Sequence, residues 1–260
     1  METLYKITIF QLQNVIRSTW ISIYTLGLIL LTTLIIYFTN DSSKIIVSLM
    51  TIMFILNPLM GVLFGSIYLY NSREFIELVL TQPITRGTLY FGLFLGLSIP
   101  IVFVTLVGVG FPLALSRIIE PELIGNLVAT SIFVICIFVS IAFLITTFID
   151  ERSTGLGIAF IVWLVLCWVY DGFVLFFSYA FQDYPIEKIL LGLTIVNPID
   201  LARINILIKF DAAAMLGITG AVFQEFISAT WGKILTFFAH IVWIVLPLAF
   251  GYKKFKKKDF

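Results

Sequence analysis

The chain alternates between long apolar stretches and short polar segments. Six stretches are almost wholly apolar, at residues 20–38, 45–70, 89–115, 123–149, 155–181 and 234–252. A helix needs ~20 apolar residues to cross the ~30 Å hydrocarbon layer of a bilayer. The stretches lack the period-two alternation of membrane-barrel strands. We therefore predict an all-α membrane protein with six transmembrane helices, forming a single transmembrane domain over residues 1–260.

The composition agrees with this pattern and adds the orientation. Hydrophobic residues make up 60% of the chain and charged residues 12%, whereas soluble domains carry ~25% charged residues. With the N-terminus inside, 10 of the 16 Lys and Arg residues face the cytoplasm, and five of these lie in the run 253–258. Basic residues favour the cytoplasmic side. We expect an inner-membrane protein with both termini cytoplasmic, and the net charge of +1 gives no indication of a nucleic-acid partner.

Residues 3–18 precede the first stretch and mix apolar with polar positions. Such a pattern is typical of a helix lying in the membrane interface. We predict an interfacial helix along the inner leaflet.

The inner segment 71–88 is the most informative polar connection. Asn71 followed by Glu74 three positions later predicts a capped helix, and Pro83 is expected to follow its end. This helix would carry Glu74 and Glu77 on one edge, with Phe75, Ile76 and Leu78 around the rest. A short, partly apolar helix at the cytoplasmic side favours docking on another protein. Re-entry into the lipid interface is the alternative.

The outer segment 182–233 is too long for a simple turn. Asn197 followed by Pro198 predicts a helix start, with an N-cap and proline at the first helical position. Asp200 and Arg203 are expected on its more exposed side. We interpret the segment as one or two amphipathic helices on the outer leaflet or facing an outer partner.

Few residues inside the stretches can carry chemistry. Asp171 is the one carboxylate placed deep in a stretch, and such residues are usually functional or paired; it could line a polar cavity or make a buried hydrogen bond. Met50, Met53 and Met60 are weak candidates for soft-metal ligands beside Cys136 and Cys167, but ordinary packing explains them equally well. His240, the single histidine, is expected to be a packed or hydrogen-bonded residue. We predict no metal site and no catalytic residues.

The sequence contains none of the motifs that would make this chain an enzyme by itself. It has no Gly-x-x-x-x-Gly-Lys-Ser/Thr, the loop that cradles ATP phosphates, and no His-Glu-x-x-His or Gly-x-Ser-x-Gly. If ATP drives this bundle, another chain binds the nucleotide and its Mg²⁺.

Several motifs together resemble those of ABC-2 type permeases. The run Leu-Thr-Gln-Pro-Ile-Thr-Arg-Gly at 80–87 is similar to the end of the family's coupling region. Residues 153–160 with Tyr170 and Asp171 are similar to its fifth span, and Asn-Pro-Ile-Asp at 197–200 to its outer-loop motif. The combination of Asp171 with Asn-Pro-x-Asp is most similar to the branch that serves maturation of nitrous oxide reductase.

The resemblance implies a six-span ABC-2 (type V exporter-like) permease without a cofactor of its own. It implies a homodimer, a cytoplasmic NosF-like ATPase, a periplasmic NosD-like β-helix protein, and, as further partners, a copper chaperone and nitrous oxide reductase. The residues that it assigns to ATPase coupling are Glu74, Phe75, Glu77, Leu78, Pro83 and Arg86. Those expected to contact the periplasmic partner are Asn197, Pro198, Asp200 and Arg203.

Two other functions stay open from the sequence alone. One is a plain ABC-2 exporter of a lipid, peptide or ion, in which the outer segment is only a gate. The other is a secondary transporter that works without an ATPase, which the lack of detectable inverted repeats disfavours.

Overall fold

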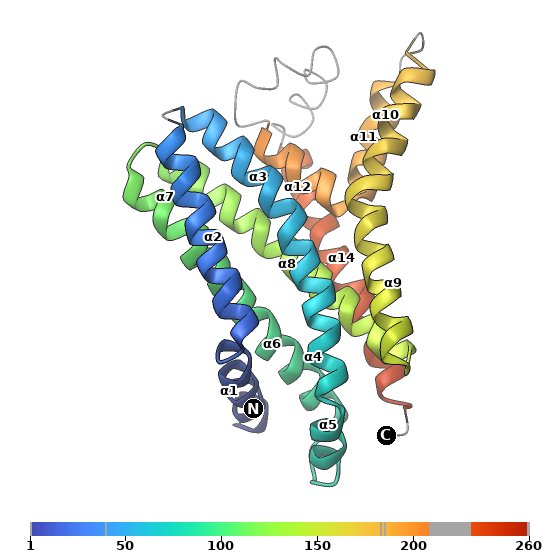
Figure 1. The fold of residues 1–260 in the computed structure, drawn as a ribbon. Coiled ribbons are helices and arrows are strands. Elements are labelled where there is room, and N and C mark those ends of the chain that lie inside the picture. The colour runs from blue at the N-terminus through green and yellow to red at the C-terminus, as the bar shows by residue number, and fades with distance from the viewer. Residues whose placement is uncertain (1, 40, 183, 185, 208–229, 259–260) are drawn as a thin grey trace.

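The computed structural model describes residues 2–39, 41–182, 184, 186–207 and 230–258. Six helical segments in this part are long and apolar enough to span a membrane, which confirms the prediction. Three are single helices: α2 (Thr19–Phe38), α8 (Pro121–Phe148) and α14 (Thr230–Phe255). Figure 1 shows the bundle, with α1 (Glu2–Ile16) below α2 and α5 (Arg73–Leu80) projecting at the same end.

The other three spans each contain a π-helical turn of five residues. The second span runs through α3 (Ser42–Leu59), η1 (Met60–Phe64) and α4 (Gly65–Asn71). The third consists of α6 (Arg86–Thr105), η2 (Leu106–Gly110) and α7 (Phe111–Ser116). The fifth consists of α9 (Arg152–Leu164), η3 (Val165–Val169) and α10 (Tyr170–Ala180). π turns are rare, and they occur frequently at functional sites.

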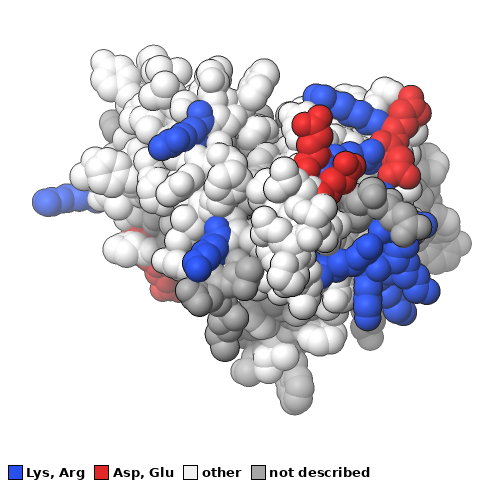
Figure 2. Space-filling view, turned by 90° about the horizontal axis from the view of Figure 1, so that it is seen from below, with Lys and Arg blue, Asp and Glu red and all other residues white. Residues whose placement is uncertain are grey.

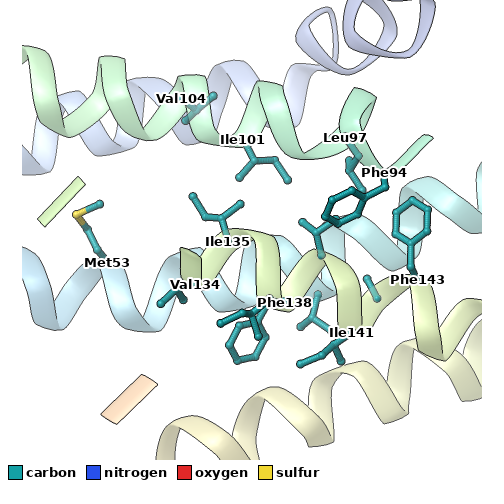
Figure 3. Packing of buried hydrophobic residues seen from close by; sticks show 14 of the residues in the cluster. Met53, Phe94, Leu97, Ile101, Val104, Val134, Ile135, Phe138, Ile141 and Phe143 are labelled. Carbon is teal, nitrogen blue, oxygen red and sulfur yellow. The ribbon is translucent and has the colours of Figure 1, made fainter. Parts of the chain in front are cut away.

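The core is built around α8, of which 72% of the most apolar window is buried. Figure 3 shows Ile101 of α6 beside Ile135 of α8, within the buried apolar cluster. Gly61 lets the second span approach closely, because a Cβ atom there would lie 2.9 Å from the Phe138 Cβ. The 61–65 glycine pair therefore serves packing within the chain, since a Cβ atom at Gly65 would likewise lie 3.0 Å from the Ala142 Cβ.

Proline at position 58 leaves backbone carbonyls of α3 without their usual helical partners. The Cys167 thiol lies 3.8 Å from the Phe54 carbonyl oxygen, and the Trp163 indole Nε1 donates to the Ile55 carbonyl at 3.1 Å. Side chains of the fifth span thus compensate for the interruption in the second span. The two spans are joined where each of them departs from regular helix.

The helix predicted at the N-terminus is present and packs against α6. Gly92 and Gly96 form the contact surface, where added Cβ atoms would lie 2.9 Å from Ile7 Cγ2 and 2.6 Å from Gln11 Cβ. Ile7 and Gln11 are buried, whereas Tyr5 is exposed. The second glycine pair therefore also serves contacts within the chain, and the position of α1 relative to the membrane interface stays a prediction.

The outer segment differs from the prediction. Helices α11 (Glu187–Val196) and α12 (Pro198–Leu207) meet at an angle of 114°, and α12 packs against α3, α8 and α14. Ile199, Leu201 and Ala202 are buried, so placing this helix on the outer leaflet was wrong for α12. The physical reason is that its apolar residues surround the helix and do not form one stripe. Residues 208–229, also within the predicted outer segment 182–233, lie outside the described part.

Candidate functional site

The first candidate surface is the tip formed by α5 and the turn after it, at the end expected to face the cytoplasm. Glu74, Glu77 and Leu78 are exposed, and Leu78 retains 62% of its accessible surface. Pro83 is also exposed and follows the helix end at Leu80, as predicted. Figure 2 shows the end of the molecule seen from below, where charged side chains gather over one part of the surface. The tip therefore presents two carboxylates beside one apolar side chain.

The remaining apolar residues of α5 pack on their own chain. Ile76 and Val79 are buried, and the Phe75 ring stacks on Phe10 of α1 with ring centroids 5.3 Å apart. Phe75 is half-buried, so only part of its ring is available to a partner. These contacts fix α5 against the spans, so a force on the exposed tip would reach the bundle.

The predicted N-cap at Asn71 was wrong. Asn71 is the last residue of α4, and Ser72 joins α4 to α5 while its hydroxyl donates to the Tyr68 carbonyl. The backbone therefore passes from the span into α5 with no intervening loop. A side-chain cap is not needed for the amide at the junction, because the Ser72 N–H already donates to the Tyr68 and Leu69 carbonyls of α4.

The base of α5 is tied to the turn between α8 and α9. The Tyr70 hydroxyl donates to the Ile149 carbonyl at 2.9 Å, and Arg73 donates to the same oxygen at 3.3 Å. Arg73 also lies 3.5 Å from the Asp150 carboxylate. This links the second span to the start of the fifth.

Arg86, predicted to act in ATPase coupling, binds the end of α14. Its Nη1 donates to the carbonyls of Phe255 and Lys256 at 3.2 Å, and also to that of Lys258. A cation at this place satisfies carbonyls that a helix end leaves without partners. Arg86 is half-buried and stabilises the C-terminal segment; a further contact with an ATPase stays a prediction.

Lys258 completes the same network. Its ammonium group lies 2.5 Å from Asp150 Oδ1 and donates to the Thr147 carbonyl at 3.2 Å. The hydrogen bond from Lys258 lowers the pKa of Asp150 below its usual range. The inner turn, α5 and the C-terminal segment thus meet at one carboxylate.

The second candidate surface is a polar centre at the bend between α11 and α12. Asn197 is fully buried and caps α12, because its Oδ1 accepts from the Ile199 amide at 3.1 Å. Its Nδ2 donates to the Leu166 carbonyl within η3 at 2.9 Å and to Asp200 at 3.2 Å. The predicted helix start is confirmed, and the same side chain joins α12 to the π turn of the fifth span.

Asp171 is paired with a residue that the sequence placed outside the spans. Arg203 Nη1 lies 2.9 Å from Asp171 Oδ2 and 3.3 Å from Asp200 Oδ1. The predicted exposure of Asp200 was wrong, since the residue retains 9% of its accessible surface. Arg203 and Asp171 side chains are about 30% exposed, at 31% and 28%. The centre therefore contains one cation between two carboxylates.

A groove of about 370 Å³ opens beside this ion pair. Asp171 and Ser178 of α10, Thr194 of α11, and Asp200 and Arg203 of α12 supply its polar lining. Asp171 thus lines a polar cavity and also makes an ion pair, which combines the two alternatives that its position suggested. The direct contact of Asn197, Pro198, Asp200 and Arg203 with an outer partner stays a prediction, and in this conformation only Arg203 of the four is not buried.

The soft ligands and the histidine lie elsewhere. Met50 and Met53 are buried in the apolar core, and Met53 Sδ is 3.9 Å from the Ser131 hydroxyl. Met60 is half-buried in η1. His240 is buried, with Nδ1 2.8 Å from the Thr236 carbonyl oxygen, which confirms its expected hydrogen-bonded position.

Comparison with known families identifies the architecture. The profile described as "ABC-2 family transporter protein" matches residues 7–260. This chain belongs to the ABC-2 transporter family. As an ABC-2 permease it is a membrane-spanning subunit, and its family implies an ATPase partner.

Two curated relatives have the same printed name, "Probable ABC transporter permease protein NosY". This chain is 26% identical to the permease of Pseudomonas aeruginosa over 223 residues, which cover 82% of this chain and 80% of the relative. It is 24% identical to that of Stutzerimonas stutzeri over 226 residues, with the same two coverages. The similarity thus extends over most of both chains, including both candidate surfaces.

Proposed function

We propose that this permease is the membrane subunit of a complex in which a cytoplasmic ATPase drives maturation of nitrous oxide reductase, namely assembly of its copper sites, on the periplasmic side. The similarity to two NosY permeases supports this assignment. The exposed tip of α5 supports the coupling role most directly, because it offers Glu74, Glu77 and Leu78 on a helix continuous with a span. ATP and Mg²⁺ are bound by the NosF-like partner.

Coupling proceeds through the anchored base of α5. Movement of the tip pulls on Arg73 and Tyr70, whose hydrogen bonds end on the turn before α9. The fifth span begins directly after this turn, so it moves with α5. Rigid-body movements of this kind are a common form of conformational coupling.

The fifth span then acts on the outer segment through the polar centre. The Asp171–Arg203 pair and the bond from Asn197 to Leu166 both join this span to α12. A tilt of α9 and α10 therefore displaces α12 and the segment beyond it, which a periplasmic NosD-like β-helix protein engages. A copper chaperone and nitrous oxide reductase would be clients of that outer assembly.

The functional unit is a homodimer. Only 17% of the apolar window of α2 and 11% of that of the fifth span are buried within the chain, against 56–72% in the second, third and fourth spans. Large side chains such as Trp168, Phe173 and Phe176 are exposed along η3 and α10. A second copy packing on these faces would cover them. Co-purification of two differently tagged copies tests the dimer, and recovery of one tag alone would contradict it.

The coupling role is tested with Glu74→Arg/Glu77→Arg in the complex with its ATPase. Both side chains are exposed, so the variant should insert and retain the melting temperature of the wild type while stimulation of ATPase activity falls at least tenfold. Arg17→Glu is the control, because it reverses an exposed charge outside both α5 and the turn before α9. Wild-type stimulation by the double variant would remove α5 from the coupling role.

A plain ABC-2 exporter is the second candidate, favoured by the groove beside Asp171. Partner identification by mass spectrometry, after pull-down from native membranes, separates the two functions. An ATPase together with a periplasmic β-helix protein supports maturation of the reductase. An ATPase alone supports the exporter.

A further inference from the structure

A second groove lies between the third and fourth spans and shares no lining residue with the groove beside Asp171. It has a volume of about 680 Å³ and is lined by residues 106–128 of η2, α7 and α8. The lining is apolar except for Arg117, and it includes Leu106, Phe111, Ile124 and Val128. Its volume is within the range of ligand sites in proteins, roughly 300–1,000 Å³.

A glycine forms part of the wall of this groove. A Cβ atom added to Gly125 would meet no other atom within 4 Å, and Gly125 is itself one of the lining residues. Since this glycine lies within α8 and no close packing requires it, its helix would tolerate a larger side chain. The empty space in front of it therefore belongs to the surface of the bundle and can admit a ligand.

Arg117 stands at the end of the groove where the third span ends. It is exposed, and its backbone is left-handed with φ 54°. Within the described part of the chain its guanidinium has no hydrogen bond or ion pair. A cation at a span's end lies at the depth of lipid headgroups, where it can meet a phosphate.

The length of the groove matches one leaflet. From Leu106 to Arg117 the chain advances 11 residues, which corresponds to ~16 Å of helix. Half of the ~30 Å hydrocarbon layer is ~15 Å. An acyl chain beginning at Arg117 would therefore reach the end of the groove near the bilayer centre.

The charges of the connecting turn restrict the headgroup. In this turn the carboxylate of Glu120 lies three positions after Arg117, so one cation and one anion stand close together in the chain. Glu120 is exposed and, among described residues, has no ion pair. A purely anionic headgroup offers no partner to Glu120, whereas a zwitterionic one can place its phosphate at Arg117 and its ammonium at Glu120.

We propose that this groove is a binding site for one zwitterionic glycerophospholipid of the phosphatidylethanolamine type. One acyl chain lies along the groove in front of Gly125, and the phosphate is bound by Arg117. The site is separate from the coupling surface and from the polar centre, and it holds whether or not the complex serves nitrous oxide reductase.

Native mass spectrometry of the full-length chain, purified in detergent and titrated with palmitoyl-oleoyl phosphatidylethanolamine, tests the site. The wild type should retain one lipid per chain. Gly125→Leu, which fills the groove, and Arg117→Asn, which removes the cation while suiting a left-handed backbone, should each lower the occupied fraction at least fivefold. One substitution adds a side chain and the other removes a charge, so a folding defect in one variant leaves the other to test the site.

Two control variants make the same kinds of substitution outside the groove. Gly157→Leu fills open space at an exposed helical glycine of α9, and Arg152→Gln removes an exposed arginine at the other end of the bundle; both should retain the lipid. Wild-type retention by Gly125→Leu, or equal losses in the controls, would overturn the site. Preference for phosphatidylglycerol over phosphatidylethanolamine in competition would overturn the headgroup assignment.

Discussion

Arg203 of α12 lies 2.9 Å from Asp171 of the fifth span, and this pair joins two elements that are 32 residues apart in the chain. The same guanidinium also contacts Asp200, which lies one helical turn before it. The arrangement explains how a carboxylate can lie inside an apolar span, because a neighbouring element brings its cation to the same depth. The same ion pair ties the bend between α11 and α12 to the fifth span, so the position of this bend, here called the joint, depends on that span.

The first prediction concerns the charge balance of this joint. Arg203→Gln should lower the free energy of unfolding by about 2–4 kcal/mol, because two carboxylates then face each other without a cation. Asp171→Asn should cost only about 1 kcal/mol, since Arg203 keeps Asp200 as a partner and both groups are partly exposed. Thermal unfolding of the purified chain at pH 7 measures both changes.

The double variant Asp171→Asn/Arg203→Gln should be more stable than Arg203→Gln alone, because only one carboxylate is left to be accommodated. Lys44→Gln is the control, as it removes one partner of an exposed pair 4.0 Å apart, and its effect should stay below ~0.5 kcal/mol. Strictly additive losses in the double variant would contradict the coupling between these residues.

A second prediction compares two helix caps. Asn197→Ala removes the cap of α12 and leaves the Leu166 carbonyl without its donor, so it should cost about 2–4 kcal/mol. Asp41→Ala removes an exposed cap, in which the carboxylate accepts from the Ser43 amide at 2.9 Å, and should cost ~1 kcal/mol. Equal melting temperatures for the two variants would show that the bond to η3 contributes nothing.

The six spans were predictable because hydrophobic length alone determines them. The ends found in the structure extend the predicted stretches by up to three residues, as at Arg86 and Phe255, where amphipathic side chains continue a helix beyond the apolar run. The cap at Asn197 and the helix end before Pro83 were also predictable, since both depend on local chemistry. The resemblance to ABC-2 permeases, carried by short motifs, is confirmed by the profile match.

The insertion of α12 and the pairing of Arg203 were not predictable from the chain alone. Both depend on the 114° bend, which turns α12 into the bundle, and no local pattern specifies that angle. Asn71 was misassigned for a related reason: a capping pattern is only needed where a helix begins anew, and α5 continues from α4. The distribution of apolar residues around α12, including Ile199 and Leu201, was the available signal that most of this helix is buried.

A third prediction follows from the lowered pKa of Asp150. Since the hydrogen bond from Lys258 depresses this pKa in the folded chain, its stabilising effect is complete above the unfolded value of ~3.9 and is lost as pH falls through the lower folded pKa. The protection factors of the amides of residues 255–258, in which the intrinsic pH dependence of exchange is divided out, should therefore be high at pH 7 and fall below pH ~4.

The variant Asp150→Asn removes the acceptor charge and should show lower protection factors than the wild type at pH 7, with the two converging in acid, where the wild-type carboxyl is protonated. Glu151→Gln is the control, because the Glu151 carboxylate bonds Ser153 and Thr154 and does not contact the C-terminal segment. If Asp150→Asn had wild-type protection factors at pH 7, the Lys258–Asp150 pair would contribute nothing to holding the C-terminal segment.

The last prediction concerns Gly251 of α14 and the Tyr90 hydroxyl of α6. A Cβ atom at position 251 would overlap this hydroxyl, which is buried and has no hydrogen-bond partner among the described residues. Gly251→Ala alone should therefore cost about 1–3 kcal/mol through overpacking. Tyr90→Phe keeps the ring contact with Phe143 at 5.2 Å and should be neutral or stabilising by ~1 kcal/mol, because an unsatisfied buried group is removed.

In the double variant the nearest atoms to the new methyl group lie 3.5 Å away, and alanine favours a helix over glycine by ~1 kcal/mol. The double variant should thus melt at or above the wild-type temperature. A double variant no more stable than Gly251→Ala would show that the hydroxyl is not what excludes a side chain at position 251.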